Sequence, residues 1–197
     1  ELQLSLGITD IPIDLPARYN IAPSQPIGAV LDGQTRKFEW LRWGLVPSWA
    51  KDVNIGNKLI NARSETIMEK PSFRSAFQRR RCLILADGFF EWKKFTQKGV
   101  ASQPYYFYLK DQPVFAFAGI WEIWQPAEGG ELWSAAIITC SANALVSPVH
   151  ERMPVILDGD TMWQWLENKQ PTQLNDMLKP YRADKMAAHP VSRALNS

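Results

Sequence analysis

Two histidines and one glutamate set among aromatic rings are the residues of this sequence best suited to moving protons. His150 lies just ahead of an apolar run, where a titratable imidazole could act as an acid or a base, or could simply pack in a loop. Glu91 is flanked by Phe90 and Trp92, and partial burial among rings would raise its pKa and suit it to proton transfer. The alternative for Glu91 is a strand residue that faces water. His189, near the end of the sequence, is expected to have a structural or surface role.

Three polar side chains earlier in the chain could hold a substrate. Asn61 follows an apolar pair and could orient a reacting group, although an amide at such a place can also cap a turn. Arg63 and Arg74 could bind phosphate groups, and the alternative for each is an ordinary surface cation. These residue types are compatible with an anionic substrate but do not require one.

The two cysteines exclude a disulfide scaffold and indicate a reducing compartment such as the cytoplasm. Two separated histidines and two separated cysteines show no metal-ligand spacing, so neither a metal site nor a cofactor is expected. Cys82 lies within an apolar run and is expected to be an inert core thiol. Cys140 ends an apolar run shortly before His150, which leaves open a cysteine hydrolase that uses Cys140 and His150, with Glu91 as a third group.

The segments that carry these residues are expected to be short strands joined by shaped loops, because 14 Pro and 11 Gly are spread through the chain. A hairpin is expected from residues 27–31 and 35–42, and a second strand pair from residues 81–86 and 89–95. Further strands are expected at residues 105–109, 114–121, 132–139 and 153–157. Short helices are expected at residues 72–78, 142–146, 161–168 and 173–178, with Ser72, Asp160 and Thr172 as N-caps of the first, third and fourth.

This pattern predicts a single α+β domain over residues 1–197 in which antiparallel pairing dominates. Strands and helices do not alternate, and there is no glycine-rich phosphate loop, which argues against a dinucleotide or nucleoside-triphosphate enzyme. No apolar stretch is long enough to span a bilayer, and the first ten residues lack the pattern of a signal peptide. We therefore expect no membrane partner.

Charge is distributed unevenly, although the formal net charge is only +2. Residues 36–110 hold fifteen Lys and Arg against six Asp and Glu, and the rest of the chain has an excess of acidic residues. Several Trp and Phe residues lie in the same basic stretch. Positive charge interleaved with aromatic rings suits the binding of single-stranded nucleic acid. The alternative is scattered solvated charge, with most of the rings in the core.

A series of short motifs occurs in order between residues 18 and 157. They are residues 18–23 (RYNIAP), 43–49 (WGLVPSW), 61–66 (NARSET), 81–84 (RCLI), 88–92 (GFFEW), 117–122 (FAGIWE), Thr139 with 142–143 (AN), and 150–154 (HERMP). Each motif alone is weak, but the ordered set closely resembles the SRAP family, the SOS response-associated peptidases or abasic site processing proteins.

The resemblance implies a twisted, barrel-like sheet core with short peripheral helices. It also implies a protein, expected to be a monomer, that binds single-stranded DNA and captures abasic sites covalently. In the family, an N-terminal cysteine forms a Schiff base with the aldehyde of the abasic sugar and then closes a thiazolidine ring. The peptidase activity would be autoproteolytic, removing the residue ahead of that cysteine. The expected location is the cytoplasm, in association with the nucleoid if the protein is bacterial.

The resemblance also assigns roles to individual residues. It implies that Asn61 positions the amine or the sugar, that Glu91 steers protons during imine formation, and that His150 is an acid/base for sugar opening and crosslink reversal. The implied DNA contacts are Asn20, Pro23, Trp43, Arg63, Arg74, Trp92, Thr139 and Arg152.

The sequence departs from the family pattern at its beginning. The family begins Met-Cys-Gly-Arg, whereas this sequence begins with Glu1 and has no cysteine before Cys82. We expect the native chain to carry the family's N-terminal segment ahead of these residues. The alternative is a natural chain without that cysteine, which would bind single-stranded nucleic acid without forming a crosslink. The 197 residues as written should not form a thiazolidine.

Overall fold

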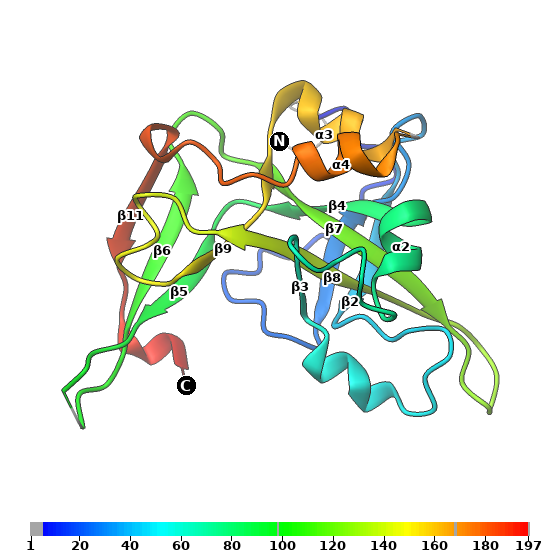
Figure 1. The fold of residues 1–197 in the computed structure, drawn as a ribbon, viewed down its shortest axis with the longest axis horizontal. Helices are drawn as coiled ribbons and strands as arrows, with labels where there is room; N and C mark the ends of the chain where they lie inside the picture. Colours follow the sequence, from blue (N-terminus) through cyan, green and yellow to red (C-terminus); the bar gives the residue numbers. More distant parts are fainter. Residues whose placement is uncertain (1–5, 98, 168, 197) are drawn as a thin grey trace.

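Two sheets make up the fold drawn in Figure 1, a large mixed sheet closed into a barrel and a smaller three-stranded sheet beside it. The computed structural model describes residues 6–97, 99–167 and 169–196. The strands of the large sheet are β1 (Pro26–Val30), β2 (Phe38–Trp43), β3 (Asn61–Arg63), β4 (Arg81–Ala86), β7 (Phe115–Trp124), β8 (Leu132–Ser141), β9 (Arg152–Pro154) and β10 (Ile156–Leu157). The strands of the small sheet are β5 (Phe89–Lys93), β6 (Gln103–Leu109) and β11 (Met186–Pro190).

The barrel closes because β8 pairs on both sides. Antiparallel pairs join β2 to β1, β1 to β4, β4 to β7 and β7 to β8. β8 then returns to β2 through a parallel pair, in which Arg42 lies opposite Ser134 and Trp43 opposite Ala135. β3 also runs parallel to β8. Closure leaves these five strands without a free edge and fixes β8 at the centre of the site described below.

Two glycines set the path of the chain between β2 and β3. Gly44 has a φ of +123°, and a Cβ on it would lie 2.6 Å from the carbonyl oxygen of Gly56. A Cβ on Gly56 would in turn lie 2.7 Å from the carbonyl oxygen of Gly44. The two backbones can approach this closely only because neither residue has a side chain, and this contact fixes the segment that leads into β3.

The helices are short and lie at the periphery of the barrel (Figure 1). They are α2 (Arg74–Arg79), α3 (Gly159–Leu166) and α4 (Pro171–Asp176), with 3₁₀ segments η1 (Val53–Lys58), η2 (Ala183–Lys185) and η3 (Arg193–Asn196). The buried Arg81 donates hydrogen bonds of 2.7–2.9 Å to the carbonyls of Phe77 and Gln78 in α2 and of Trp165 and Glu167 at the end of α3. One cation therefore satisfies carbonyls that both helices leave unpaired at their C-terminal ends. None of the described helices is long and apolar enough to cross a membrane.

The predicted fold class is confirmed, and so are the hairpin of β1 with β2 and the strands at β4, β6, β7 and β8, to within a few residues. The predicted pairing of residues 81–86 with 89–95 is wrong. β4 is buried and pairs with β1 on one side and β7 on the other, so it has no edge left for β5. β5 pairs with β6 instead.

The structure also differs from the predicted helices. The helix predicted over residues 142–146 is absent, and residues 144–149 form a turn, in which the side chain of Asn143 accepts hydrogen bonds from the amides of Leu145 and Val146, at 3.1 and 3.0 Å. Ser72 does not cap α2, which begins at Arg74 without a side-chain cap.

The other two predicted N-caps, Asp160 and Thr172, are wrong by two residues. Helix α3 is capped by Asp158, and α4 by Gln170, because Pro171 takes the first helical position. The strand predicted over residues 153–157 is split into β9 and β10, since the chain there moves from pairing with β8 to pairing with β7.

Candidate functional site

The centre of the candidate site is a carboxylate–imidazole pair between the small sheet and the loop that precedes β9. On β5, Glu91 lies on the same face as Phe89, which stacks on Phe107 in the core. Oε1 of Glu91 lies 3.9 Å from Nδ1 of His150. Burial raises the pKa of Glu91, and the neighbouring His150 partly opposes that rise. The predicted desolvation of this carboxylate is confirmed.

The ring of His150 is oriented by the backbone two residues further on. Its Nδ1 lies 3.1 Å from the amide nitrogen of Arg152 and 3.0 Å from the carbonyl oxygen of the same residue. Neutral imidazole with a free Nδ1 accepts the hydrogen bond from the amide, whereas a ring protonated at Nδ1 donates to the carbonyl. Either protonation state therefore has a partner on Arg152, and the side chain of His150 remains 41% exposed to solvent.

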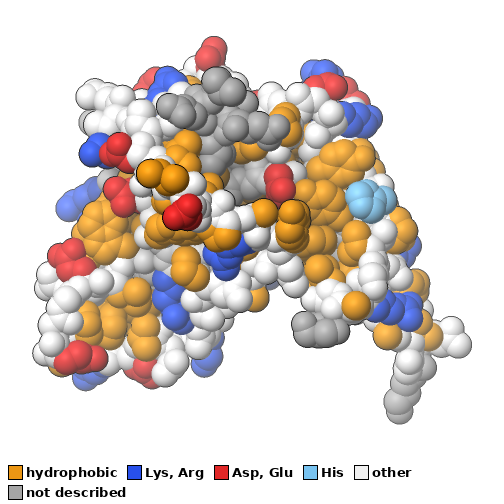
Figure 2. Space-filling model, turned by 180° about the vertical axis from the view of Figure 1, so that it is seen from behind, with side chains coloured by type: hydrophobic (Ala, Val, Ile, Leu, Met, Phe, Trp, Pro, Cys, Tyr) orange, Lys and Arg blue, Asp and Glu red, His pale blue; other side chains and the backbone are white. Residues whose placement is uncertain are grey.

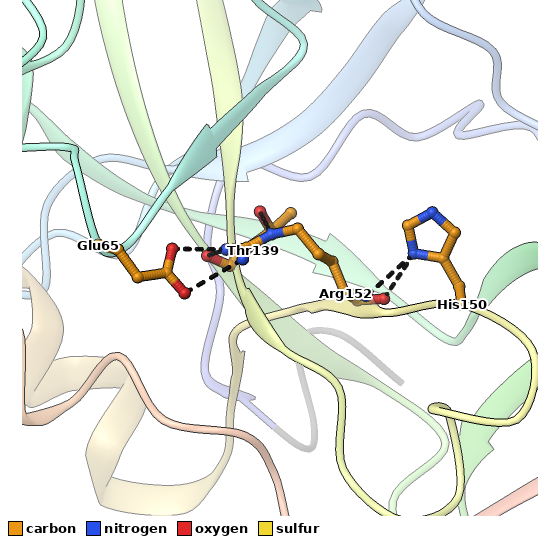
Figure 3. A network of polar contacts seen from close by, with 4 residues as sticks. All are labelled: Glu65, Thr139, His150 and Arg152. Carbon is orange, nitrogen blue, oxygen red and sulfur yellow. Dashed lines mark hydrogen bonds and ion pairs between the residues drawn. The ribbon is translucent and has the colours of Figure 1, made fainter.

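Arg152 is itself held by a dense set of hydrogen bonds, drawn in Figure 3. Its guanidinium donates to Thr139 at Oγ1, 3.1 Å, and at the backbone carbonyl, 2.8 Å. It also donates to both carboxylate oxygens of Glu65, at 3.1 and 2.8 Å. This bidentate pair lowers the pKa of Glu65. In the structure, Arg152 therefore binds groups of the protein itself and fixes the start of β9 next to His150.

β3 places two of the predicted site residues alongside β8. Arg63 lies opposite Thr139, and Asn61 lies opposite Ile137. The amide of Ser64 donates to the carbonyl of Thr139 at 2.9 Å, which extends the contact by one residue. Asn61 and Arg63 are both exposed and, because they alternate with the buried Ala62, point to the same side of the strand.

Trp43 connects β3 to the loop before β1. Its indole N–H donates to the carbonyl of Ile60 at 3.0 Å, directly ahead of Asn61. Its backbone carbonyl accepts from the amide of Ser24 at 2.7 Å, so the exposed Pro23 lies beside it. Asn20 is exposed and donates to the carbonyl of Leu195 at 3.1 Å, which links the same loop to the C-terminal segment.

The remaining two predicted DNA contacts are Trp92, whose backbone amide donates to the carboxylate of Glu91, and Arg74. Trp92 follows Glu91 on β5 and lies opposite Pro104, on the other face of the strand. Arg74 opens α2, which packs against β4 and β7. Within the described part of the chain, no hydrogen bond or ion pair joins the side chain of Arg74 to the network.

Glu65 is not among the site residues predicted from the sequence, and the structure makes it a central partner of Arg152. Its only sequence signal is its place in the motif of residues 61–66, four positions after Asn61. Glu65 also lines a cavity of about 240 Å³ together with Cys140 and Leu178. Cys140 is 2% exposed, and burial raises its pKa to about 11. Burial likewise raises the pKa of Cys82, which is the inert core thiol that was predicted.

The described residues offer no cluster of three or more His, Cys, Asp or Glu that could hold a metal ion. The site provides a carboxylate–imidazole pair, Glu91 with His150, and β3, alongside β8, presents the exposed amide of Asn61 and the exposed guanidinium of Arg63.

Sequence and structure comparisons agree on one family. Residues 3–197 match the family described as SOS response associated peptidase (SRAP). The chain is 47% identical over 182 residues to the abasic site processing protein YoqW of Bacillus subtilis. The aligned region covers 91% of this chain and 80% of that protein. It is 38% identical over 192 residues to the abasic site processing protein HMCES of Gallus gallus, covering 84% of this chain and 56% of that protein.

Solved structures show the same fold. A crystal structure of a protein from Bacteroides thetaiotaomicron superposes with a TM-score of 0.80 at 31% identity, over 86% of this chain and 75% of that one. A second, from Bordetella bronchiseptica, has a TM-score of 0.81 at 24% identity, over 97% of this chain and 94% of that one, and supports the fold alone. The family resemblance of the ordered motifs is thus confirmed, and the chain belongs to the SRAP family.

Proposed function

We propose that this protein binds single-stranded DNA and traps abasic sites through a covalent crosslink. The observation that carries the proposal is the pairing of Glu91 with His150 at 3.9 Å, together with the exposed Asn61 and Arg63 on β3, a strand linked to the loop of His150 through Thr139 and Arg152. The names of the relatives support an abasic-site substrate. The nucleophile of this proposal is an N-terminal cysteine, as the SRAP family carries.

The chemistry needs two proton transfers that this pair can supply. The α-amine of the cysteine adds to the aldehyde carbon of the opened sugar, and the resulting carbinolamine loses water to form a protonated imine. The departing hydroxyl takes a proton from an acid, and the raised pKa of Glu91 lets that carboxyl keep a proton at higher pH than an exposed glutamate does. The thiol then adds to the imine carbon and closes the thiazolidine, giving its proton to a base, the role we assign to His150.

Asn61 and Arg63 have the exposure that contact with the sugar and the phosphates requires. Asn61 would orient the reacting sugar through its amide, and Arg63 would bind a phosphate next to it. Trp43 is half-buried and its indole is already bonded to Ile60, so it offers a partly exposed edge beside the lesion. Pro23 and Asn20 lie on the adjoining loop.

Arg152 fits a different role from the one that the resemblance implies. Its donors bind Thr139 and Glu65, so in this proposal it positions the loop of His150, and a phosphate would have to displace Glu65 to reach it. The cysteine hydrolase considered from the sequence is disfavoured, because the buried thiol of Cys140, with a pKa of about 11, holds almost no thiolate at neutral pH.

The proposal is tested with full-length protein whose first residue is confirmed as cysteine by mass spectrometry. The protein is incubated with single-stranded DNA that bears one abasic site and is then run on a denaturing gel. We expect a covalent shift that is absent when the N-terminal cysteine is replaced by serine and absent with intact DNA. Salt-dependent binding without any shift, and without preference for the lesion, would identify a non-catalytic binder and overturn the proposal. We further propose that loss of the residue ahead of the cysteine occurs at the same site, which the same mass spectra test.

A further inference from the structure

The small sheet has two faces of different character. On the inner face, Phe89 and Phe107 stack at 5.1 Å and pack into the core, and Met186 is buried beside them. The outer face is formed by the alternate positions, which pair Phe90 with Tyr106 and place His189 opposite Tyr106 and Ala187 opposite Tyr108. These outer residues are half-buried or exposed. We call Phe90, Tyr106, Tyr108 and His189 the aromatic face.

The rings of the aromatic face are ordered with respect to one another. Tyr106 and Tyr108 have centroids 5.8 Å apart and planes only 18° apart. His189 packs edge-on against both, at 5.7 and 5.8 Å, and Phe90 lies 5.2 Å from Tyr106. The ring of Tyr106 is held over Gly88, where a Cβ would lie 2.3 Å from it. The rings are therefore arranged in advance rather than free to collapse.

Figure 2 shows hydrophobic side chains gathered on the lobe at the right of that view, with a histidine among them. The outward positions of β5, β6 and β11 carry rings, Trp92 among them, and two other apolar residues, Pro104 and Ala187. Aromatic rings are also enriched at protein–protein interfaces, but flat rings on a sheet with basic side chains beside them suit the stacking of bases along a nucleic acid strand.

The charges at the edge of the aromatic face favour an anionic ligand. Asp184 is paired with Arg182 at 2.6 Å, and Asp111 faces Lys185 at 3.9 Å. Lys94, which follows β5, and Arg193, in the segment η3 that contacts β6, are exposed, and neither forms an ion pair within the described residues. Asp184 and Asp111 are thus neutralised, and Lys94 and Arg193 together outnumber Asp87, which is hydrogen-bonded to Tyr106.

We propose that the aromatic face is a second binding surface for single-stranded nucleic acid, which holds the strand that flanks the lesion. This inference rests on the proposed function. The strand β5 connects the two surfaces, because it lies at the edge of the small sheet and its alternate residues serve both faces. Glu91 points to His150, and its neighbour Phe90 points to the aromatic face. A strand leaving the lesion reaches the rings by passing around this edge.

The test compares unmodified single-stranded oligonucleotides of about 6 and about 20 nucleotides, since sites of this kind span roughly 4–16 nucleotides. For the wild-type protein we expect the longer strand to bind at least about tenfold more tightly, as one stacked base contributes about that factor. The double variant Tyr108→Ala/His189→Ala should bind the short strand as the wild type does, but should lose most of the additional affinity for the longer strand. The matched variant Tyr108→Phe/His189→Phe keeps the rings and should keep the gain. Trp40→Ala, which removes a 40% exposed ring on the barrel strand β2, is a control expected to change nothing.

A second measurement does not depend on the variants. Ultraviolet crosslinking with 5-iodouracil placed near the ends of the longer strand should mark Tyr106, Tyr108 or His189 in the mapped peptides. The inference would be overturned by crosslinks confined to the barrel. It would also be overturned if the double alanine variant still bound the longer strand more tightly than the short one by the wild-type factor. Crosslinking of a short lesion strand, measured in parallel, separates this outcome from failure of the proposed function, because the residues assigned to that reaction do not include the aromatic face.

Discussion

Arg152 and Glu65 are joined by two hydrogen bonds of 2.8 and 3.1 Å, although 87 positions separate them in the sequence. These two hydrogen bonds join the loop after β3 to the first residue of β9. Because the amide and carbonyl of Arg152 also contact the ring of His150, the position of that ring depends on an ion pair that contains no reacting atom.

Glu65→Ala is expected to lower the free energy of unfolding by about 1 kcal/mol, a modest value because the carboxylate is half exposed. Glu65→Gln keeps one acceptor and should cost less. Since Arg152 holds the pKa of Glu65 below its unfolded value of about 4.3, this stabilisation is fully present above that pH and is lost as the pH falls through the folded pKa. Urea unfolding at neutral and acidic pH measures the difference, which should shrink in acid. An equal difference at both pH values would contradict the assignment.

Glu91→Gln is expected to slow crosslink formation by roughly 10²-fold or more, the usual contribution of a general acid or base. The same substitution should not lower the free energy of unfolding, although it slows the reaction. Burial raises the pKa of Glu91, so the wild type loses stability as the pH rises from the unfolded pKa through the folded one. At neutral pH the glutamine variant should therefore be at least as stable as the wild type. Crosslinking time courses and thermal melts test this pair of effects, and a destabilised variant with normal rates would refute it.

Arg63→Ala should weaken binding of single-stranded DNA and reduce the slope of log affinity against log salt by about 0.7, the value for one phosphate contact on a single strand. Arg63 is exposed and lies opposite Thr139 at the edge of the site. Arg182→Ala is the matched control, since that exposed arginine is already paired with Asp184. Equal slopes for Arg63→Ala and the wild type would exclude a phosphate contact at this position.

Arg81→Ala is expected to destabilise the protein by about 3 kcal/mol or more, because it leaves carbonyls of both α2 and α3 without their donor in a buried place. Arg81→Lys keeps the charge but has too few donors in the wrong geometry, so it should recover only part of the loss. Urea unfolding monitored by tryptophan fluorescence measures both. A loss below about 1 kcal/mol for the alanine variant would show that water replaces the guanidinium.

Cys140→Ala should leave crosslinking unchanged, because the thiol is buried and its pKa is raised to about 11. Iodoacetamide should alkylate Cys140 in the native protein far more slowly than in urea. Loss of crosslinking in this variant, with an intact fold by circular dichroism, would restore the cysteine as a participant.

The sequence predicted what depends on local pattern. Period-2 alternation and turn residues located most strands, and the rings around Glu91 correctly indicated a desolvated carboxylate. It did not predict what depends on partners far along the chain. Nothing in the sequence near Arg81 shows that β4 pairs with another strand on each of its two edges. The predicted pairing of β4 with β5 is therefore wrong. The role of Glu65 likewise exists only because β3 and β9 both lie against β8.

The parallel closure of the barrel has a consequence for how this protein acquires its structure. Arg42 pairs with Ser134 and Asn61 with Ile137, so these contacts require loops of many tens of residues to close first. Loop closure of this kind slows folding more than it affects stability. During synthesis, β2 emerges well before the strand that completes its pairing, and its outer edge stays open until β8 leaves the ribosome, whereas β4 is completed earlier by β7. The proton-transfer pair is assembled later still, since His150 lies beyond β8 in the chain.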